Sequence, residues 1–149
     1  MTETCVILDV GGVLEFTPRP GASGASAKTP NEELVAYLRG IRRRCRLGIL
    51  SNSFVGARER ETALYRFDEL VDEIVYSHEI GINKPDPRAF EAACAALGVR
   101  PEDCLFVDDV LVNVEAARGL GMQAHLYEDN ARTIARIAAH VEAGRALHG

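Results

Sequence analysis

A short apolar run that ends in an acid and two glycines constrains the fold of this chain more than any other stretch. Cys5–Leu8 (CVIL) is followed by Asp9, Val10, Gly11 and Gly12. An apolar run of this length bounded by glycine predicts a strand buried on both faces, which is typical of parallel sheets. Asp9 then lies at the carboxyl end of a strand, where α/β sheets bind ligands. The alternative for this stretch alone is an aspartate that caps a turn.

Further apolar runs alternate with helical patterns along the rest of the chain. Strands are predicted at residues 46–50, 73–77, 104–107 and 123–127, and helices at residues 29–41, 56–67, 87–97, 111–120 and 130–146. Thr29 is the expected N-cap of the first helix, and residues 78–86 are expected to form a loop. This alternation predicts right-handed βαβ crossovers, hence a three-layer α/β/α sandwich with a mostly parallel, Rossmann-like sheet of about five strands.

The length of 149 residues fits one domain, residues 1–149, in which Glu15–Lys28 reads as a flexible loop because it is rich in Gly, Ala, Ser and Pro. The composition is that of a soluble globular protein, without an apolar run of roughly 20 residues or a secretory signal. We therefore expect a cytoplasmic protein that does not enter a membrane. The net charge of −5 argues against general binding to nucleic acid.

Two further groups of residues receive structural interpretations. The basic run Arg42, Arg43, Arg44 and Arg46 follows a predicted helix, where cations complement the helix dipole. The four cysteines lack metal-ligand spacing and indicate neither a zinc site nor a disulfide framework.

Polar residues follow the predicted strands in four places. They are Asp9, Ser51, Lys84 in the 78–86 loop, and the pair Asp108 and Asp109. Because the carboxyl ends of parallel strands meet at one edge, we expect these side chains to converge. Each has an ordinary alternative when taken alone: an N-cap for Ser51 or Ser53, a solvated loop charge for Lys84, and the cap of the next helix for Asp109.

The combination of residues suits phosphoryl transfer. Clustered carboxylates repel one another unless a cation lies between them, and their hard oxygen ligands favour Mg²⁺. An aspartate can attack phosphorus to form an aspartyl phosphate, while a lysine stabilises the developing charge.

The motifs LDVGGVL, ILSNS, GINKPDPRAF and LFVDDVLVNVEAARGLGM resemble those of the haloacid dehalogenase (HAD) superfamily. The resemblance is strongest to its phosphatase-like branch, which includes the N-terminal domain of soluble epoxide hydrolases. It implies that Asp9 is the nucleophile and a Mg²⁺ ligand, and that the carbonyl of Gly11 is a second ligand. It also implies that Asp109 is a side-chain metal ligand supported by Asp108.

The same resemblance assigns the substrate-binding residues. Ser51 and the backbone of Asn52 would bind phosphate, and Lys84 would contact both the nucleophile and the phosphate. Asn113 would lie at the edge of the site or support its ligands.

Two departures from the family pattern affect the expected activity. Phosphatases of the family usually carry a second Asp two residues after the nucleophile as the general acid and base, and here that position is Gly11. Glu15 and His125 are the candidates to replace it. The chain also has too little sequence between the first two motifs for a helical cap domain, so we expect an open site.

Three functions remain open at this stage. The first is a Mg²⁺-dependent phosphatase that acts on a small or macromolecular phosphorylated substrate, with activity weakened by Gly11. The second is a catalytically impaired binding or regulatory module, and the third is haloacid-dehalogenase-type hydrolysis. A second copy of the chain is a possible cover for the open site.

Overall fold

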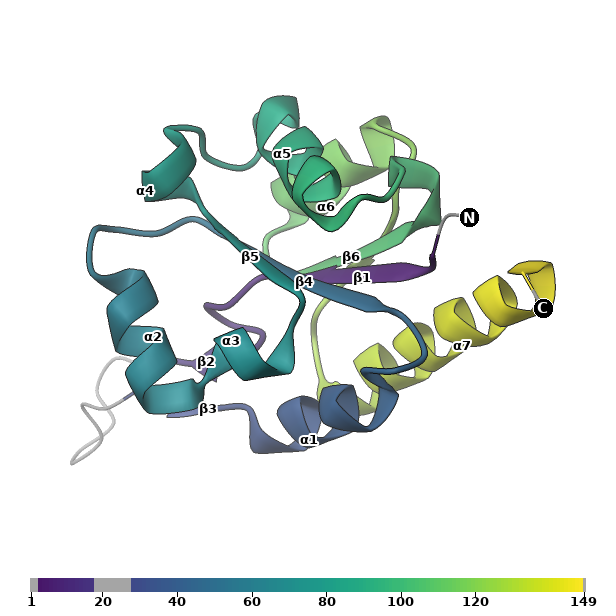
Figure 1. The fold of residues 1–149 in the computed structure, drawn as a ribbon, viewed down its shortest axis with the longest axis horizontal. Helices are drawn as coiled ribbons and strands as arrows, with labels where there is room; N and C mark the ends of the chain where they lie inside the picture. The colour runs from purple at the N-terminus through teal and green to yellow at the C-terminus, as the bar shows by residue number, and fades with distance from the viewer. Residues whose placement is uncertain (1–2, 18–27, 149) are drawn as a thin grey trace.

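The computed structural model describes residues 3–17 and 28–148, and its centre is a five-stranded parallel sheet (Figure 1). The strands lie in the order β5-β4-β1-β6-β7, with bounds Glu73–Tyr76, Arg46–Ser51, Cys5–Leu8, Cys104–Asp108 and Gln123–Leu126. Each strand agrees with its predicted range to within one residue at either end. The prediction of a mostly parallel sheet of about five strands is therefore confirmed.

The register of the central strand positions the site. Within β1, Leu8 pairs with Ile49 of β4 on one side and with Val107 of β6 on the other. The next residue, Asp9, donates its backbone N–H to the carbonyl of Val107 at 3.0 Å. Asp9 therefore leaves the sheet between the ends of β4 and β6.

Helices cover both faces of the sheet, which gives the predicted three layers (Figure 1). One core contains apolar side chains of α1 (Glu32–Ile41), α3 (Phe67–Leu70) and α7 (Asn130–His148). The other contains those of α5 (Pro87–Leu97) and α6 (Leu111–Gly119). Because β1, β4 and β6 contribute to both cores, their sequences read as continuous apolar runs rather than as alternating patterns.

The N-cap predicted for the first helix was wrong. Thr29 and Pro30 form the short strand β3, which pairs with β2 (Glu15–Phe16), so Thr29 cannot cap the helix. Asn31 takes this role: its side chain accepts a hydrogen bond from the N–H of Leu34 and donates one to the carbonyl of Val13. The cap thereby ties α1 to the turn that follows β1.

Three other segments differ from their predictions. The helix predicted at 56–67 is divided into α2 (Ala57–Tyr65) and α3 because Arg66 adopts a left-handed conformation with φ of 52°. The predicted 78–86 loop begins inside a short helix, α4 (Ser77–Ile80). The Glu15–Lys28 loop starts as strand β2, and its residues 18–27 lie outside the described residues.

The predicted start and end of α5 are confirmed. Asp86 caps its N-terminus by accepting a hydrogen bond from the N–H of Arg88, and Pro87 occupies the first turn. Gly98 ends the helix with a φ of 69°. Among the described residues, every helix is too short or too polar to cross a bilayer.

The C-terminal helix is tied to the sheet by a buried histidine. His140 Nε2 lies 3.1 Å from the carbonyl oxygen of Cys5 and 3.2 Å from that of Asp103, so it donates to both. Burial lowers the pKa of His140 below its ordinary value of 6.5, more than the two carbonyls raise it. The folded protein therefore favours neutral His140.

We predict that His140→Ala lowers the free energy of unfolding at pH 7.5 by about 1–3 kcal/mol, because buried carbonyls lose their donor. Protonation of His140 favours the unfolded chain, so this contribution is present above pH 6.5 and is lost as the pH falls below it. The difference between wild type and variant should therefore shrink between pH 7.5 and 5.5. Urea denaturation followed by circular dichroism measures it, and a difference independent of pH would contradict the assignment.

Candidate functional site

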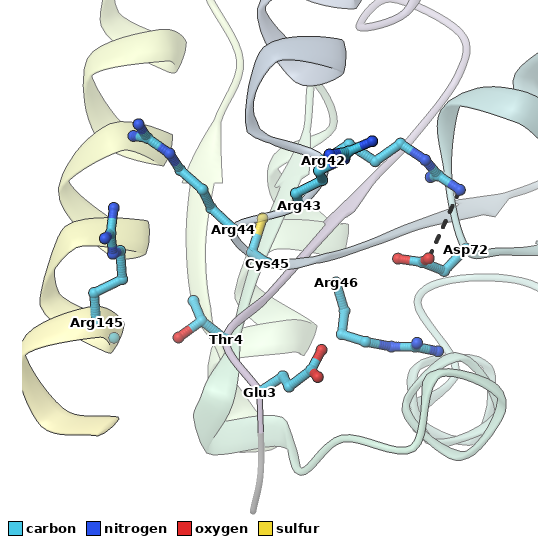
Figure 2. Close-up of a pocket in the computed structure, with 10 residues that line it drawn as sticks. Glu3, Thr4, Arg42, Arg43, Arg44, Cys45, Arg46, Asp72 and Arg145 are labelled. Carbon is cyan, nitrogen blue, oxygen red and sulfur yellow. Dashed lines mark ion pairs between the residues drawn. The ribbon is translucent and has the colours of Figure 1, made fainter. Parts of the chain in front are cut away.

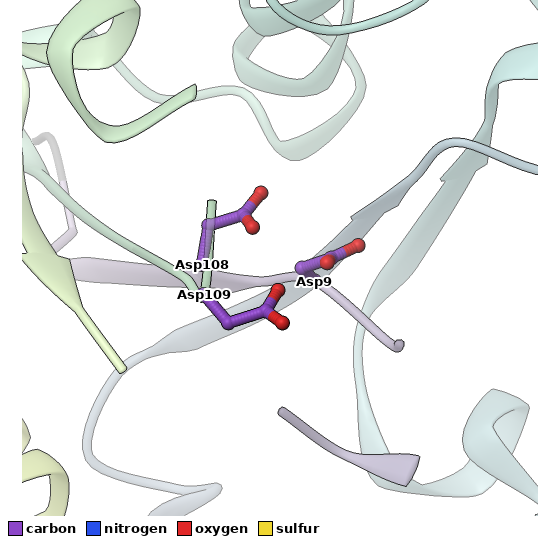
Figure 3. A group of neighbouring side chains, drawn as sticks. All are labelled: Asp9, Asp108 and Asp109. Atoms are coloured by element: carbon purple, nitrogen blue, oxygen red, sulfur yellow. The ribbon is translucent and has the colours of Figure 1, made fainter. Parts of the chain in front are cut away.

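Three aspartates meet at the carboxyl edge of the sheet. Asp9 follows β1, Asp108 is the last residue of β6, and Asp109 comes next in the chain. One carboxylate oxygen from each lies within 4.8 Å of one from each of the others. Figure 3 shows the three carboxylates extending in the same general direction from the ends of their strands. The structure thus brings together residues that are a hundred positions apart in the sequence.

Lys84 supplies the positive charge of this cluster. Its Nζ lies 2.9 Å from Asp9 Oδ1, 3.0 Å from Asp108 Oδ2 and 2.8 Å from the carbonyl oxygen of Leu50. Only 1% of the Lys84 side chain is exposed, so the ammonium has exchanged water for these three acceptors. This arrangement fixes the Asp9 carboxylate beside the end of β4.

The side chain of Asn52 fixes the backbone of Lys84. Asn52 Oδ1 accepts a hydrogen bond of 2.8 Å from the Lys84 N–H, and Asn52 Nδ2 donates one of 3.0 Å to the Lys84 carbonyl. The family resemblance implies a role only for the backbone of Asn52, so this side-chain contact was not predicted from the sequence. An Asn directly after a strand is the signal present in the sequence, but its partner is 32 residues away.

Asp108 and Asp109 have different environments. Asp108 is fully buried and accepts hydrogen bonds from Lys84, from the N–H of Val110 and from Asn113 Nδ2, the last at 3.1 Å. Asp109 is exposed to solvent. Asn113, which is itself buried, therefore supports Asp108, whereas Asp109 is the carboxylate that an incoming cation can reach.

The local electrostatics favour a cation. Burial raises the pKa of Asp9 from 3.8 to about 6, with Lys84 opposing this change and Asp108 adding to it. Burial and the neighbouring Asp108 also raise the pKa of Asp109. Three carboxylates facing one ammonium carry two excess negative charges when ionised, which a divalent cation would neutralise. The all-oxygen donor set fits Mg²⁺ better than a softer metal.

Gly12 lets the first motif approach Asp109 closely. A Cβ at Gly12 would lie 2.0 Å from Asp109 Oδ2, and the φ of Gly12 is +81°. Both features disfavour any other residue here. Gly11 differs, because a Cβ there would have no heavy atom within 4 Å. The close contact between Gly12 and Asp109 was not predicted from the sequence.

A cavity of about 400 Å³ is lined in part by Val10 and Gly11, the two residues after Asp9, whereas the three aspartates and Lys84 do not line it. Gly11, Ser51 and Asn52 line one side of it, and Lys28, Phe54, Val55 and Arg60 are among the residues that line the remainder. Ser51 is buried, and its Oγ lies 3.4 Å from the carbonyl oxygen of Asn52. Residues assigned to phosphate binding thus share a concave surface that is large enough for a small organic phosphate.

The two candidate replacements for the missing acid have other partners. Glu15 lines the cavity, but it is buried, pairs with Arg60 at 2.8 Å and accepts a hydrogen bond from Tyr65. His125 lies on β7, and its Nε2 is 2.9 Å from Thr133 Oγ1 on α7. Both side chains are therefore engaged in contacts within the fold.

The comparison with protein families matches residues 4–121 to the haloacid dehalogenase-like hydrolases. A curated relative, phosphatase MT3486 of Mycobacterium tuberculosis, is 43% identical over 94 residues. The match covers 62% of this chain and 43% of the relative, so the chain spans less than half of that relative's length.

Solved structures share the fold over nearly the whole chain. A crystal structure of a Corynebacterium glutamicum protein superposes with a TM-score of 0.75 at 26% identity, covering 93% of this chain and 95% of that one. A HAD family enzyme of Bacteroides thetaiotaomicron, in complex with magnesium and inorganic phosphate, gives a TM-score of 0.72 at 18% identity. This second match covers 84% of this chain and 94% of the other.

The contrast between the two glycines predicts unequal effects of the same substitution. Gly12→Ala should lower the free energy of unfolding by about 1–3 kcal/mol, because the added Cβ meets Asp109 and the backbone is left-handed. Gly11→Ala adds the same methyl group to open space and should change stability by less than about 0.5 kcal/mol. Chemical denaturation of both variants tests this, and equal destabilisation would show that the close contact at Gly12 is not maintained.

Proposed function

Because the chain belongs to the haloacid dehalogenase-like hydrolase family, we propose that it is a Mg²⁺-dependent phosphatase with Asp9 as its nucleophile. The observation that carries this proposal is the position of Lys84 Nζ between Asp9 and Asp108, with Asp109 close enough for one ion to contact all three acids. A cation that prefers hard oxygen ligands suits this cluster of carboxylates. When bound, Mg²⁺ would neutralise the carboxylates and the phosphate charge during attack.

In the first proposed step, a carboxylate oxygen of Asp9 attacks the phosphorus atom. A bond forms between this oxygen and phosphorus while the bond from phosphorus to the leaving group breaks, which yields an aspartyl phosphate. Lys84 holds the Asp9 carboxylate in position and stabilises charge on the transferred phosphate. Ser51 and the backbone of Asn52 bind the phosphate oxygens from the other side of the cavity. Water then hydrolyses the acyl phosphate and regenerates Asp9.

Leaving-group protonation is the step for which the first motif lacks a residue. A carboxylic acid at position 11 would protonate the departing oxygen and later activate water, and Gly11 supplies neither function. General acid–base catalysis contributes about 10²–10⁴ in rate. We infer that the protein hydrolyses aryl and acyl phosphates, whose leaving groups depart without protonation, in preference to alkyl phosphates.

The openness of the site bears on the substrate. The chain lacks the sequence for a helical cap, and two large apolar side chains beside the cavity are almost fully exposed, Phe54 at 88% and Val55 at 91%. Val110 and Leu111, which follow Asp109, are also exposed. These side chains would contact a large substrate, or a second copy of the chain that covers the site.

Gly11 also supports a second candidate function, a module that binds Mg²⁺ and phosphate without turnover. Phosphate binding requires Ser51, Asn52 and Lys84 but does not require a proton donor. Dehalogenation is less well supported, because three clustered acids suit a metal and the open cavity offers little shelter for a halide.

The nucleophile assignment predicts the effect of Asp9→Asn. An amide cannot form the aspartyl phosphate, so the variant should release phosphate from 4-nitrophenyl phosphate no faster than buffer does. Asp68→Asn, which changes an exposed acid on α3, should retain wild-type activity. Removal of Mg²⁺ with EDTA should also abolish turnover. Activity that survives in Asp9→Asn would exclude Asp9 as the nucleophile.

Gly11→Asp separates a weak phosphatase from a binding module. Position 11 lines the cavity and has space for a side chain, so the variant should gain about 10²–10⁴ in kcat for alkyl phosphates and much less for acetyl phosphate. Gly11→Asn is the matched control, with the same shape but no acid. A series of aryl phosphates should show a shallower dependence of rate on leaving-group pKa in Gly11→Asp than in wild type. If wild type and Gly11→Asp both bind phosphate without turnover, the binding module is the better description.

A further inference from the structure

A second cavity, of about 320 Å³, lies at the amino edge of the sheet, at the opposite end of the strands from Asp9. The residues before β1, the connection from α1 to β4 and the end of α7 line this cavity. Its basic residues are Arg42, Arg43, Arg44, Arg46 and Arg145. Figure 2 shows the Arg44 side chain reaching toward α7, which carries Arg145. Five arginines from two distant parts of the sequence therefore surround one concave surface.

Two of these arginines are held by the fold. Arg42 donates a hydrogen bond of 2.6 Å to the carbonyl of Leu70 and lies 3.8 Å from Asp72. Arg46 donates one of 3.1 Å to the carbonyl of Leu97. These contacts hold the guanidinium groups of both residues in place.

The other three have no carboxylate partner among the described residues. Arg43, Arg44 and Arg145 are exposed, and none forms an ion pair with the side chains of residues 3–17 or 28–146. The two acids that line the cavity are Glu3 and Asp72, so the lining has a positive excess in a chain with a net charge of −5. Burial and these two acids raise the pKa of Cys45 to about 12, so its thiol adds no negative charge.

A close helix contact positions Arg145. A Cβ at Gly144 would lie 1.7 Å from Thr4 Oγ1, so the end of α7 rests directly on the residue before β1. Only glycine permits this approach. This contact fixes the backbone next to Arg145, which lines the cavity.

We propose that this cavity binds a small anion with two or three linked phosphate groups. Arginine forks form paired hydrogen bonds with phosphate oxygens, and several guanidinium groups around one cavity can engage neighbouring phosphates at once. The volume fits a small molecule. The negative net charge disfavours an extended polyanion such as nucleic acid, whose phosphates would meet the remaining surface.

The competing explanation is that these arginines only complement helix C-termini. Arg43 and Arg44 follow α1, and Arg145 lies in the last turn of α7. Such a role requires no ligand, so direct binding distinguishes the two explanations.

Calorimetric titration with tripolyphosphate in EDTA tests the proposal, because without a divalent cation the carboxylate edge repels anions. Wild type should bind one equivalent. The triple variant Arg43→Gln, Arg44→Gln, Arg145→Gln should bind at least about tenfold more weakly, since each removed guanidinium takes charge-assisted hydrogen bonds with it. The matched control, Arg39→Gln, Arg88→Gln, Arg132→Gln, removes the same charge elsewhere and should bind within about twofold of wild type.

Further variants keep the test independent of folding defects and of the phosphatase proposal. Arg145→Lys keeps the positive charge but loses the paired N–H donors of the guanidinium group. It should weaken tripolyphosphate binding and leave the circular dichroism spectrum unchanged. Asp9→Asn should bind tripolyphosphate as wild type does, whether or not the protein is a phosphatase. Equal affinity in wild type and the cavity triple variant would overturn the proposal. So would binding of citrate or of a poly-glutamate peptide that is as tight as binding of tripolyphosphate.

Discussion

The buried ammonium of Lys84 is the interaction on which the rest of the site depends. It is held by acceptors at the carboxyl ends of three strands: Asp9 after β1, the Leu50 carbonyl in β4, and Asp108 in β6. A charge removed from water is tolerated only when it is paired and fully hydrogen-bonded, and a fully buried Asp108 would be costly without it. The same contact therefore stabilises the strand ends and orders the proposed nucleophile.

The strand order explains why these groups can meet. β1 lies at the centre of the sheet, so the residue after it is flanked by the ends of both β4 and β6. Helices on both faces close off the sides of the sheet and leave its carboxyl edge open. The two adjacent acids have different surroundings. Asp108 accepts hydrogen bonds from Lys84, Val110 and Asn113, and Asp109, one residue later, is exposed to solvent. A buried carboxylate organises the site while an exposed one remains available to a cation.

The sequence predicted the sheet well because doubly buried strands leave a strong signal, an uninterrupted apolar run that ends in polar residues. It predicted local boundaries less well where tertiary contacts decide them. Thr29 has the residue type of an N-cap, but pairing with β2 removes it and Asn31 caps the helix. The break at Arg66 depends on a left-handed conformation that arginine seldom adopts.

For the site, too, the residues at strand ends could be predicted from the sequence, whereas contacts between distant loops could not. Residue types at strand ends indicated Asp9, Asp108 and Asp109, because a parallel sheet gathers its carboxyl ends. Lys84 lies in the loop after α4, and its approach to these acids depends on that loop. Contacts between loops could not be found in this way. The Asn52 side chain binds a backbone 32 residues away, and Gly12 is required by a carboxylate almost a hundred residues away. Such pairings depend on distances that no local pattern records.

The two ends of the central strand carry opposite unbalanced charge. From Thr4 to Asp9 the chain advances about 16 Å at about 3.3 Å per residue, which exceeds the screening length of about 8 Å at physiological ionic strength. Exposed arginines at one end therefore do little to neutralise the carboxylates at the other. The net charge of −5 conceals this separation, since it sums over both. The carboxylate edge is neutralised in part by Lys84. The arginine edge has no comparable internal counterion for Arg43, Arg44 and Arg145 among the described residues, and this asymmetry is why an anion is the ligand inferred there.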